Sequence, residues 1–201
     1  MRHPCRWGDF LCGLAAAAFF SGGLGGCTPL DTDEVRSPLG TTTRVVMVRH
    51  AERDEGLDPP LNEEGFVRAQ ALADELADDG VTAIYYPNLL RNRQTAEPLV
   101  EIADPTIRVF STVESGDTKA MANRFADEIV TDHAGGVILW IGNTGPVIEG
   151  VQEGNLQEVY RRLGGTGDPP LKYSDFYEIT IHDDRAPTFV ERTYGGTSSL
   201  D

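Results

Sequence analysis

Cysteine is nearly absent from this chain of 201 residues. Its three cysteines, Cys5, Cys12 and Cys27, all lie within the first 27 residues. A disulfide framework or a zinc site built from cysteine pairs needs cysteines in the folded region, and thiol catalysis needs at least one there. The sequence therefore excludes these three classes of site from everything after residue 27.

Positive charge is also scarce. The chain has 17 Lys and Arg residues against 32 Asp and Glu residues, which gives a net charge of −15, and only Lys119 and Lys172 are lysines. So acidic a surface repels nucleic acid, and a nucleic-acid partner is excluded. The sequence also lacks a glycine-rich dinucleotide fingerprint and a Gly-x-Ser-x-Gly elbow, which argues against a dehydrogenase and a serine hydrolase.

The first residues have the pattern of an export signal. Arg2 and Arg6 precede an apolar run, Phe10–Phe20, that is shorter than the roughly 20 residues needed to span a bilayer. The segment Leu24-Gly25-Gly26-Cys27 resembles the bacterial lipobox, whose cysteine is lipidated and becomes the first residue of the mature protein. We expect a signal peptide over residues 1–26 and an exported lipoprotein, anchored through Cys27 on the periplasmic face or the cell surface. The alternatives are an ordinary secretion signal and an uncleaved N-terminal anchor.

The remaining chain divides into three parts. Residues 27–43 are polar and contain Pro29, Pro38 and Gly40, which is typical of a flexible tether. A domain is predicted over residues 44–194, and a disordered tail over residues 195–201.

Within the domain, short apolar segments alternate with segments of helical periodicity. Strands are expected over residues 44–49, 81–86, 107–111, 137–142, 176–181 and 187–194, and helices over residues 62–77, 89–102, 119–131, 146–153 and 156–163. Pro98 is expected to kink or break the second helix. Because strands that alternate with helices form a mostly parallel sheet, we predict an α/β fold with three α/β/α layers and an antiparallel closing hairpin.

Basic side chains follow two of the expected strands. His50 comes directly after the first strand, next to Arg49 and close to Arg53, while Arg91 and Arg93 begin the helix after the second strand. Ligands of such sheets bind beyond the carboxyl ends of the strands, and helix N-termini favour anions. Arginine suits phosphate because its planar fork bonds two oxygens. The pattern predicts an oxyanion site; the alternative for His50 is a structural loop hydrogen bond.

Several motifs together carry a resemblance to a known family. The motifs are RHAE at residues 49–52, DPPL at 58–61, YPNLLRNRQTA at 86–96 and YSDFY at 173–177. They resemble the histidine phosphatase superfamily, the phosphoglycerate mutase-like proteins, and the resemblance extends over residues 44–194. It implies a metal-free phosphohydrolase without a cofactor. Its partner would be a small phosphorylated substrate or a phosphorylated protein side chain.

The resemblance also implies roles for individual residues. His50 matches the nucleophile that becomes phosphohistidine, and Arg49 and Arg91 match the two phosphate-binding arginines. Arg53 is a third cation at the mouth of the site, whereas Arg93 is expected on the helix surface. The family commonly uses an acidic proton donor after its third strand, and Glu114 is the first candidate for it, ahead of Asp117.

Two positions depart from the family pattern. Asn143 stands where the family has a second histidine, and Gly56 stands where many relatives have an asparagine. The Asn143 side chain can donate a hydrogen bond to a phosphate but carries no positive charge, or it can cap a following helix. The expected function is therefore a membrane-tethered phosphomonoester hydrolase with reduced activity. The alternative is a non-catalytic phospho-ligand binding or interaction module on the same fold.

Overall fold

The computed structural model describes residues 34–145 and 154–201, all of which belong to one compact unit, Asp31–Asp201. The predicted signal peptide, the lipidation site Cys27 and the expected helix over residues 146–153 lie outside the described residues. Within the described residues, no helix is long and apolar enough to cross a membrane.

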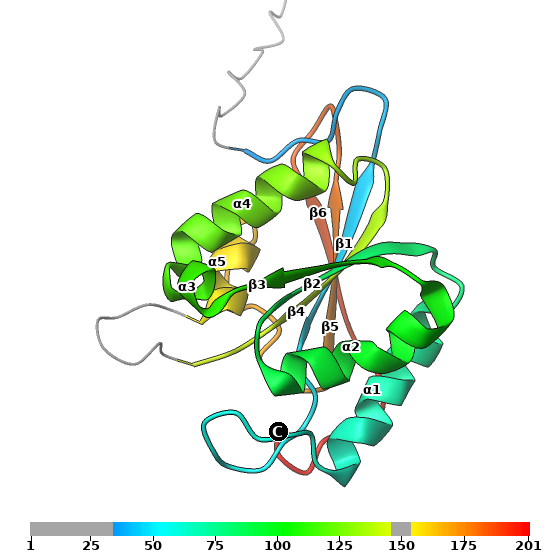
Figure 1. Cartoon of the computed structure of the whole chain (residues 1–201). Coiled ribbons are helices and arrows are strands. Elements are labelled where there is room, and N and C mark those ends of the chain that lie inside the picture. The colour runs from blue at the N-terminus through cyan, green and yellow to red at the C-terminus, as the bar shows by residue number, and fades with distance from the viewer. Residues whose placement is uncertain (1–33, 146–153) are drawn as a thin grey trace, which may run out of the picture. The chain divides into compact units, whose positions relative to one another are not determined.

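One mixed sheet forms the centre of the domain (Figure 1). Its strands are β1 (Thr43–Arg49), β2 (Val81–Pro87), β3 (Thr106–Phe110), β4 (Val137–Gly142), β5 (Asp175–Ile181) and β6 (Thr188–Thr193). They lie in the order β3-β2-β4-β1-β5-β6. The first four of these are mutually parallel, and β5 and β6 are antiparallel to their neighbours. The predicted mostly parallel sheet with an antiparallel closing hairpin is confirmed.

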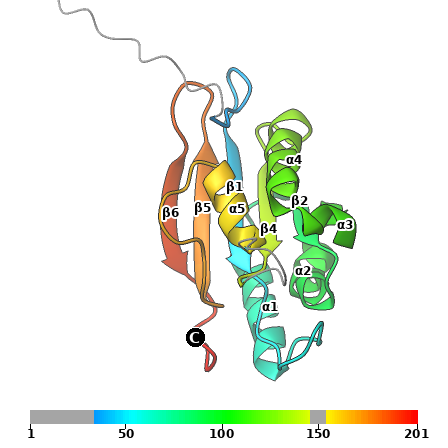
Figure 2. The ribbon, with the colours of Figure 1, turned by 90° about the vertical axis from the view of Figure 1, so that its left-hand side faces the viewer.

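Helices cover both faces of the sheet. They are α1 (Glu63–Leu76), α2 (Leu90–Ala103), α3 (Thr112–Gly116), α4 (Thr118–Thr131) and α5 (Asn155–Arg162). Figure 1 shows α1 and α2 on one side of the sheet and α4 and α5 on the other, and Figure 2 shows α5 in front of β1 and β5. The three-layer arrangement is therefore as predicted. The helix α2 continues through Pro98, so the expected break does not occur there.

The alternation of side chains along β1 explains the two apolar layers. Val46 and Val48 pack with residues of α1 and α2, such as Leu72 and Leu99. Val45 and Met47 point the other way, into the cluster that contains the apolar residues of α4 and α5. Strands buried on both faces read as continuous apolar runs, which is why this strand was evident in the sequence.

The domain is longer at both ends than the sequence indicated. Val35 is buried in the core, and the Ser37 N–H donates to the His182 carbonyl at 3.0 Å, so residues 34–43 belong to the domain and are not a free tether. The expected disordered tail is also ordered. The Asp201 carboxylate accepts hydrogen bonds from the Tyr173 N–H at 2.8 Å and the Ser174 hydroxyl at 3.1 Å.

The helix α1 packs tightly against the loop that follows β1. Asn62 caps the helix by accepting from the Gly65 N–H at 2.9 Å. A Cβ atom on Gly65 would lie 2.0 Å from the Glu52 carbonyl oxygen, so only glycine permits this approach. Arg68 of the same helix is buried and pairs with Glu52, while Phe66 is 48% exposed. These contacts between α1 and Glu52 hold the loop that carries His50 in place.

Candidate active site

The strand order brings three sequence-distant segments together at one edge of the sheet. β4 lies between β1 and β2, so the residues after these three strands are neighbours. Arg49 is in register with Gly142, and the His50 N–H donates to the Gly142 carbonyl at 3.0 Å. Asn143 follows directly, and Arg91 lies in the first turn of α2. The predicted juxtaposition of His50, Arg91 and Asn143 is therefore present.

The His50 side chain is held in one tautomer. Its Nδ1 lies 2.8 Å from the Ala51 carbonyl oxygen, and because that oxygen can only accept, Nδ1 carries the proton. The Thr95 hydroxyl fixes the Ala51 N–H at 3.0 Å. Burial lowers the pKa of His50 to about 3, and the nearby Arg91 and Arg49 add to the shift. The ring is therefore neutral at physiological pH, with the lone pair on Nε2.

Arg49 is positioned by the segment before β5. Its Nη1 donates to the Leu171 carbonyl at 2.9 Å, and its Nη2 donates to the Tyr173 hydroxyl at 3.1 Å. The guanidinium also stacks 3.9 Å from the centre of the Tyr173 ring, which meets the His50 ring edge-on at 5.7 Å. The Arg49 Nε is buried and has no partner among the described residues. Burial lowers the Arg49 pKa, so this cation is incompletely compensated.

Arg91 is shared between two side-chain oxygen acceptors, and its Nη1 also donates to the Leu57 carbonyl at 3.4 Å. Its Nε donates to Asn143 Oδ1 at 3.2 Å, and its Nη1 donates to Asp58 Oδ1 at 3.1 Å. The Asp58 carboxylate also accepts from the Leu90 N–H at 3.0 Å, at the start of α2. Burial is the main cause that lowers the Arg91 pKa, and Arg53 lowers it further. Arg93, by contrast, pairs with Glu97 on the exposed side of the helix, as expected.

Asn143 is fixed through both its backbone and its side chain. Its N–H donates to Asn155 Oδ1 at 2.7 Å, and its carbonyl accepts from the Leu156 N–H at 3.3 Å. This packing requires Gly142, since a Cβ there would lie 2.6 Å from the Leu156 side chain. Because Arg91 can only donate, it takes the Asn143 oxygen and leaves the buried Nδ2 without a partner among the described residues. The alternative role of Asn143, as the cap of a following helix, concerns the expected helix over residues 146–153, which lies outside the described residues.

Arg53 adds positive charge to the same region. Its Nη1 donates to the Asp54 carbonyl at 2.7 Å, and its buried Nε has no partner in the described part of the chain. Its charge contributes to lowering the pKa of His50, Arg49 and Arg91, which places it near all three.

The structure does not bring Glu114 to the cleft. Its carboxylate pairs with Arg108 at 2.8 Å and with Arg124, and it accepts from the Ser111 N–H at 2.8 Å in a capping box. The hydrogen bonds from Arg108 and Ser111 lower the Glu114 pKa to about 2. Asp117 is likewise occupied, because it caps α4. Both residues line a separate surface hollow, so the expected role of Glu114 as proton donor is corrected.

Sequence reasoning missed Asp58 and Tyr173 as site residues. Both lie in segments that were recognised as motifs, yet neither has a sequence spacing that points to Arg91 or Arg49. They reach these arginines only through the packing of distant loops, across sequence separations of 33 and 124 residues. Within the described residues, no group of three His, Cys, Asp or Glu side chains is arranged to hold a metal ion.

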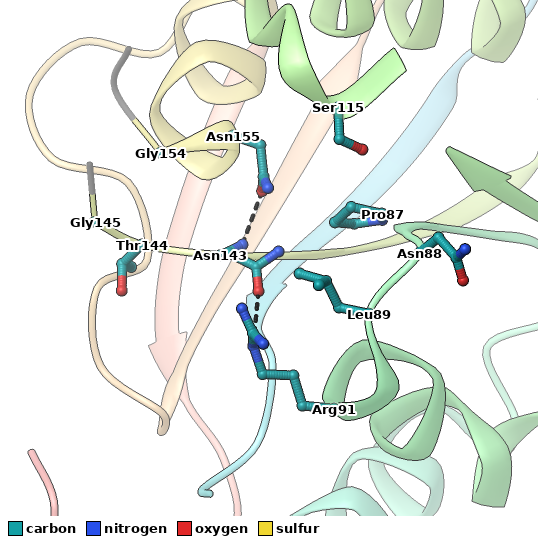
Figure 3. Close-up of a pocket in the computed structure, with 10 residues that line it drawn as sticks. All are labelled: Pro87, Asn88, Leu89, Arg91, Ser115, Asn143, Thr144, Gly145, Gly154 and Asn155. Carbon is teal, nitrogen blue, oxygen red and sulfur yellow. Dashed lines mark hydrogen bonds between the residues drawn. The ribbon is translucent and has the colours of Figure 1, made fainter. Parts of the chain in front are cut away.

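A pocket of about 210 Å³ adjoins the cleft. Arg91 and Asn143 form part of its wall, together with the loop between β2 and α2, Ser115 of α3 and the start of α5 (Figure 3). His50 is not among the residues that line it.

Comparison with known proteins agrees with this architecture. Among solved structures, the protein histidine phosphatase SixA in complex with tungstate is 18% identical, with a TM-score of 0.54 and coverage of 75% of this chain and 96% of that chain. The phosphoglycerate mutase of Bacillus anthracis is 12% identical, with a TM-score of 0.53 and coverage of 77% and 93%. A mycobacterial glucosyl-3-phosphoglycerate phosphatase in complex with inorganic phosphate is 16% identical, with a TM-score of 0.51 and coverage of 77% and 97%.

At these identities the structural matches show a shared fold. No curated protein sequence matches the chain. The model of one protein family, the histidine phosphatase superfamily (branch 1), matches residues 45–167. This match spans more than half of the chain and includes His50, Arg91 and Asn143. The chain therefore belongs to the histidine phosphatase superfamily.

Proposed function

We propose that the protein hydrolyses a phosphomonoester through a phosphohistidine intermediate on His50. The observation that carries the proposal is the state of this ring: its Nδ1 proton is held by the Ala51 carbonyl, and its Nε2 lone pair is free at physiological pH. A neutral imidazole nitrogen is the form that attacks phosphorus. Arg49, Arg53 and Arg91 gather around it and supply the positive charge that a phosphoryl group needs.

The reaction has two displacements at phosphorus. In the first, Nε2 of His50 forms a bond to phosphorus, the ester P–O bond breaks, and the departing oxygen takes a proton from water. In the second, water attacks the phosphohistidine, the P–N bond breaks, and inorganic phosphate leaves with the neutral imidazole restored. Arg49 and Arg91 neutralise the charge on the equatorial oxygens during both steps.

Two features support a reduced rate. Asn143 offers an amide in place of a second imidazole, so one charged donor to the transition state is missing. Loss of one such preorganised donor costs about 10²–10³ in rate. Glu114, paired with Arg108 and Arg124, is not available as an acid in this arrangement.

The intermediate provides the direct test. The soluble domain from Asp31 onward is incubated with a labelled phosphomonoester, quenched and examined for label on histidine. We expect label in the wild type and none in His50→Ala. Arg93→Ala is the matched control, because Arg93 pairs with Glu97 on the exposed side of α2. Label that persists in His50→Ala would refute the mechanism.

A non-catalytic phospho-ligand binder is the second candidate. The substitution at Asn143 and the distant position of Glu114 favour it, because two groups expected to assist turnover are not in place. Asn143→His separates the two candidates. If only the second imidazole is missing, kcat should rise about 10–10³-fold with a new dependence on acidic pH. A well-folded variant that is as inactive as the wild type on a broad phosphoester panel would favour the binder.

We further propose that the domain is tethered to a membrane through Cys27. The support is the sequence, in which a short apolar run leads to Leu24-Gly25-Gly26-Cys27. Cys27→Ser should abolish incorporation of a labelled fatty acid and release the protein from the membrane fraction. Equal labelling of the wild type and the variant would contradict the anchor.

A further inference from the structure

The tail, residues 195–201, is anchored to the domain beside the first turn of α1 (Figure 1). The Ser199 N–H donates to the Glu64 carboxylate at 2.7 Å, and the Gly196 carbonyl accepts from Arg68 Nη1 at 3.2 Å. Ser198 is only 6% exposed, so the tail is packed onto the domain. These anchors hold the tail where Asp201 meets the residues that precede β5.

The Asp201 carboxylate bridges two consecutive residues before β5. One of its oxygens accepts from the Tyr173 N–H at 2.8 Å, and the other accepts from the Ser174 hydroxyl at 3.1 Å. Asp175 Oδ2 accepts from two further backbone N–H groups of the same segment, each at 2.9 Å. Hydrogen bonds to an ionised acceptor are stronger than those between neutral groups. Residues 171–174 are therefore held by two carboxylates, and one of the two belongs to the tail.

The same segment holds Arg49 of the proposed phosphate site. The Tyr173 hydroxyl accepts from Arg49 Nη2 at 3.1 Å, and the Leu171 carbonyl accepts from Arg49 Nη1 at 2.9 Å. Within the described residues, both side-chain hydrogen bonds of Arg49 go to this segment. The guanidinium also stacks on the Tyr173 ring, 3.9 Å from its centre. The orientation of Arg49 therefore depends on where residues 171–174 lie.

Asp201 acts on Arg49 through its charge as well. Burial lowers the Arg49 pKa, and Asp201 opposes this shift, so its carboxylate lies near the guanidinium. A negative charge there disfavours a bound anion, whereas a guanidinium that is already oriented favours it. Both Asp201 oxygens are engaged by Tyr173 and Ser174, and no hydrogen bond joins Asp201 to Arg49 in the described part of the chain. We therefore expect the orienting effect to be the larger of the two.

We propose that Asp201 is a positioning residue of the phosphate site: it holds Tyr173, and Tyr173 holds Arg49 in the orientation that binds the phosphoryl group. The proposal rests on the proposed role of Arg49 as a phosphate ligand. It makes the tail part of the site without requiring that the tail touch the substrate. Release of Asp201 alone should loosen Arg49 while the domain stays folded, because the contacts of Ser199 and Gly196 remain.

Vanadate binding to the domain from Asp31 onward, measured by titration calorimetry, tests the proposal. Asp201→Ala removes both hydrogen bonds and should weaken binding about tenfold, as one well-placed hydrogen-bonded contact would. Asp201→Asn keeps an oxygen for the Tyr173 N–H and offers the Ser174 hydroxyl an amide to pair with, so its affinity should stay within about twofold of the wild type. Asp184→Ala is the matched control, because it removes the same charge from an exposed side chain between β5 and β6.

A double-mutant cycle separates positioning from a general loss of structure. If Asp201 acts through Arg49, Asp201→Ala should have no further effect on vanadate binding in an Arg49→Ala background, where Arg53 and Arg91 remain to bind the anion. Tyr173→Phe is the second background, because it keeps the ring but loses the hydroxyl bonded to Arg49. The effect of Asp201→Ala should be smaller there than in the wild type. Urea denaturation of each variant shows that it is folded under the conditions of the titration.

The outcomes distinguish this proposal from the proposed function. If folded Asp201→Ala binds vanadate as tightly as the wild type, or more tightly, the positioning role is overturned and hydrolysis at His50 still stands. Equal losses in Asp201→Ala and Asp201→Asn would assign the effect to charge and would also overturn it, as would an undiminished effect in the Arg49→Ala background. If Arg49→Ala itself binds vanadate like the wild type, the phosphate site is placed wrongly, and the proposed function and this proposal fail together.

Discussion

Arg68 and Arg49 lie on either side of the loop after β1, and their surroundings are opposite. The Arg68 Nε meets both carboxylate oxygens of Glu52 at 2.6 and 2.8 Å, and its Nη1 donates to the Tyr194 carbonyl at 2.9 Å. Both side chains of this pair are almost fully buried, at 2% and 0% exposure. The charge is matched within the protein, so this ion pair holds the loop and binds nothing else.

The cleft instead concentrates positive charge that the described residues match only in part. The Nε atoms of Arg49 and Arg53 are buried without partners there, and Arg91 shares the half-exposed Asp58. Burial lowers the pKa of Arg49 and of Arg91, which shows that each pays a desolvation penalty as a cation. The difference indicates that the matched Arg68 is structural, whereas the incompletely matched arginines of the cleft have the charge that the proposed phosphate site requires.

The largest expected effect comes from breaking the buried ion pair between Glu52 and Arg68. Glu52→Gln leaves the Arg68 cation buried without its counter-charge and should cost about 3–5 kcal/mol in the free energy of unfolding. Urea denaturation of the soluble domain measures this. Glu97→Gln is the control, because it breaks the exposed pair with Arg93 and should cost less than about 1 kcal/mol. Similar costs for the two variants would contradict a structural role for the buried pair.

The next largest effect comes from removing Arg91, one of the cations of the cleft. Arg91→Ala should weaken vanadate binding about 100-fold, because two charge-assisted hydrogen bonds are lost, while stability changes little. Titration calorimetry at two salt concentrations gives the affinity and its ionic component. Arg93→Ala should leave binding unchanged. If vanadate bound Arg91→Ala as tightly as the wild type, the phosphate site would lie elsewhere.

A third effect concerns His50, which is buried neutral beside these cations. Its pKa is about 3 in the folded chain and about 6.5 when unfolded, so between these values the unfolded state binds the extra proton. Stability should therefore fall as pH falls through 6.5, by roughly 2 kcal/mol between pH 6.5 and pH 5. Urea denaturation of the wild type against His50→Gln isolates this contribution. Parallel curves for the two proteins would show that His50 titrates normally.

The smallest effect concerns Arg91, whose positive charge is partly matched by Asp58. Asp58→Asn keeps an oxygen for the Leu90 N–H but removes the negative charge beside Arg91. Vanadate affinity should rise about two- to five-fold, the range of a partly exposed ion pair. Asp54→Asn changes the net charge equally without this contact and serves as the control. A fall in affinity would mean that Asp58 positions Arg91 and does not compete with the ligand.

The sequence predicted the sheet, its flanking helices and the meeting of His50, Arg91 and Asn143. Strand and helix periodicity are local signals, and the rule that ligands bind at the carboxyl ends of parallel strands joins residues far apart in the chain. These two kinds of information do not depend on how individual loops pack. They were therefore sufficient for the architecture and for the centre of the site.

The site and tail residues that the sequence predicted wrongly or missed share a different cause. Glu114 was expected in the cleft because the family resemblance implies an acidic proton donor after the third strand, but its carboxylate pairs with Arg108 and Arg124 instead. Tyr173 and the tail residue Asp201 gained their roles from hydrogen bonds between loops that have no periodicity. Competition among nearby charges and the packing of irregular segments are decided only in three dimensions.

Trp140 gives the domain its own optical reporter. The chain has two tryptophans, and a form that begins at Asp31 retains only this one, which is fully buried on β4 with its ring centre 4.8 Å from that of Phe125 and 5.9 Å from that of Phe110. Its indole nitrogen has no hydrogen-bond partner among the described residues, so the ring lies in a dry, apolar environment. Its fluorescence should be blue-shifted in the folded state and move to longer wavelength when water reaches the core. A single emission band will therefore follow unfolding of the strand that presents Asn143 to the cleft.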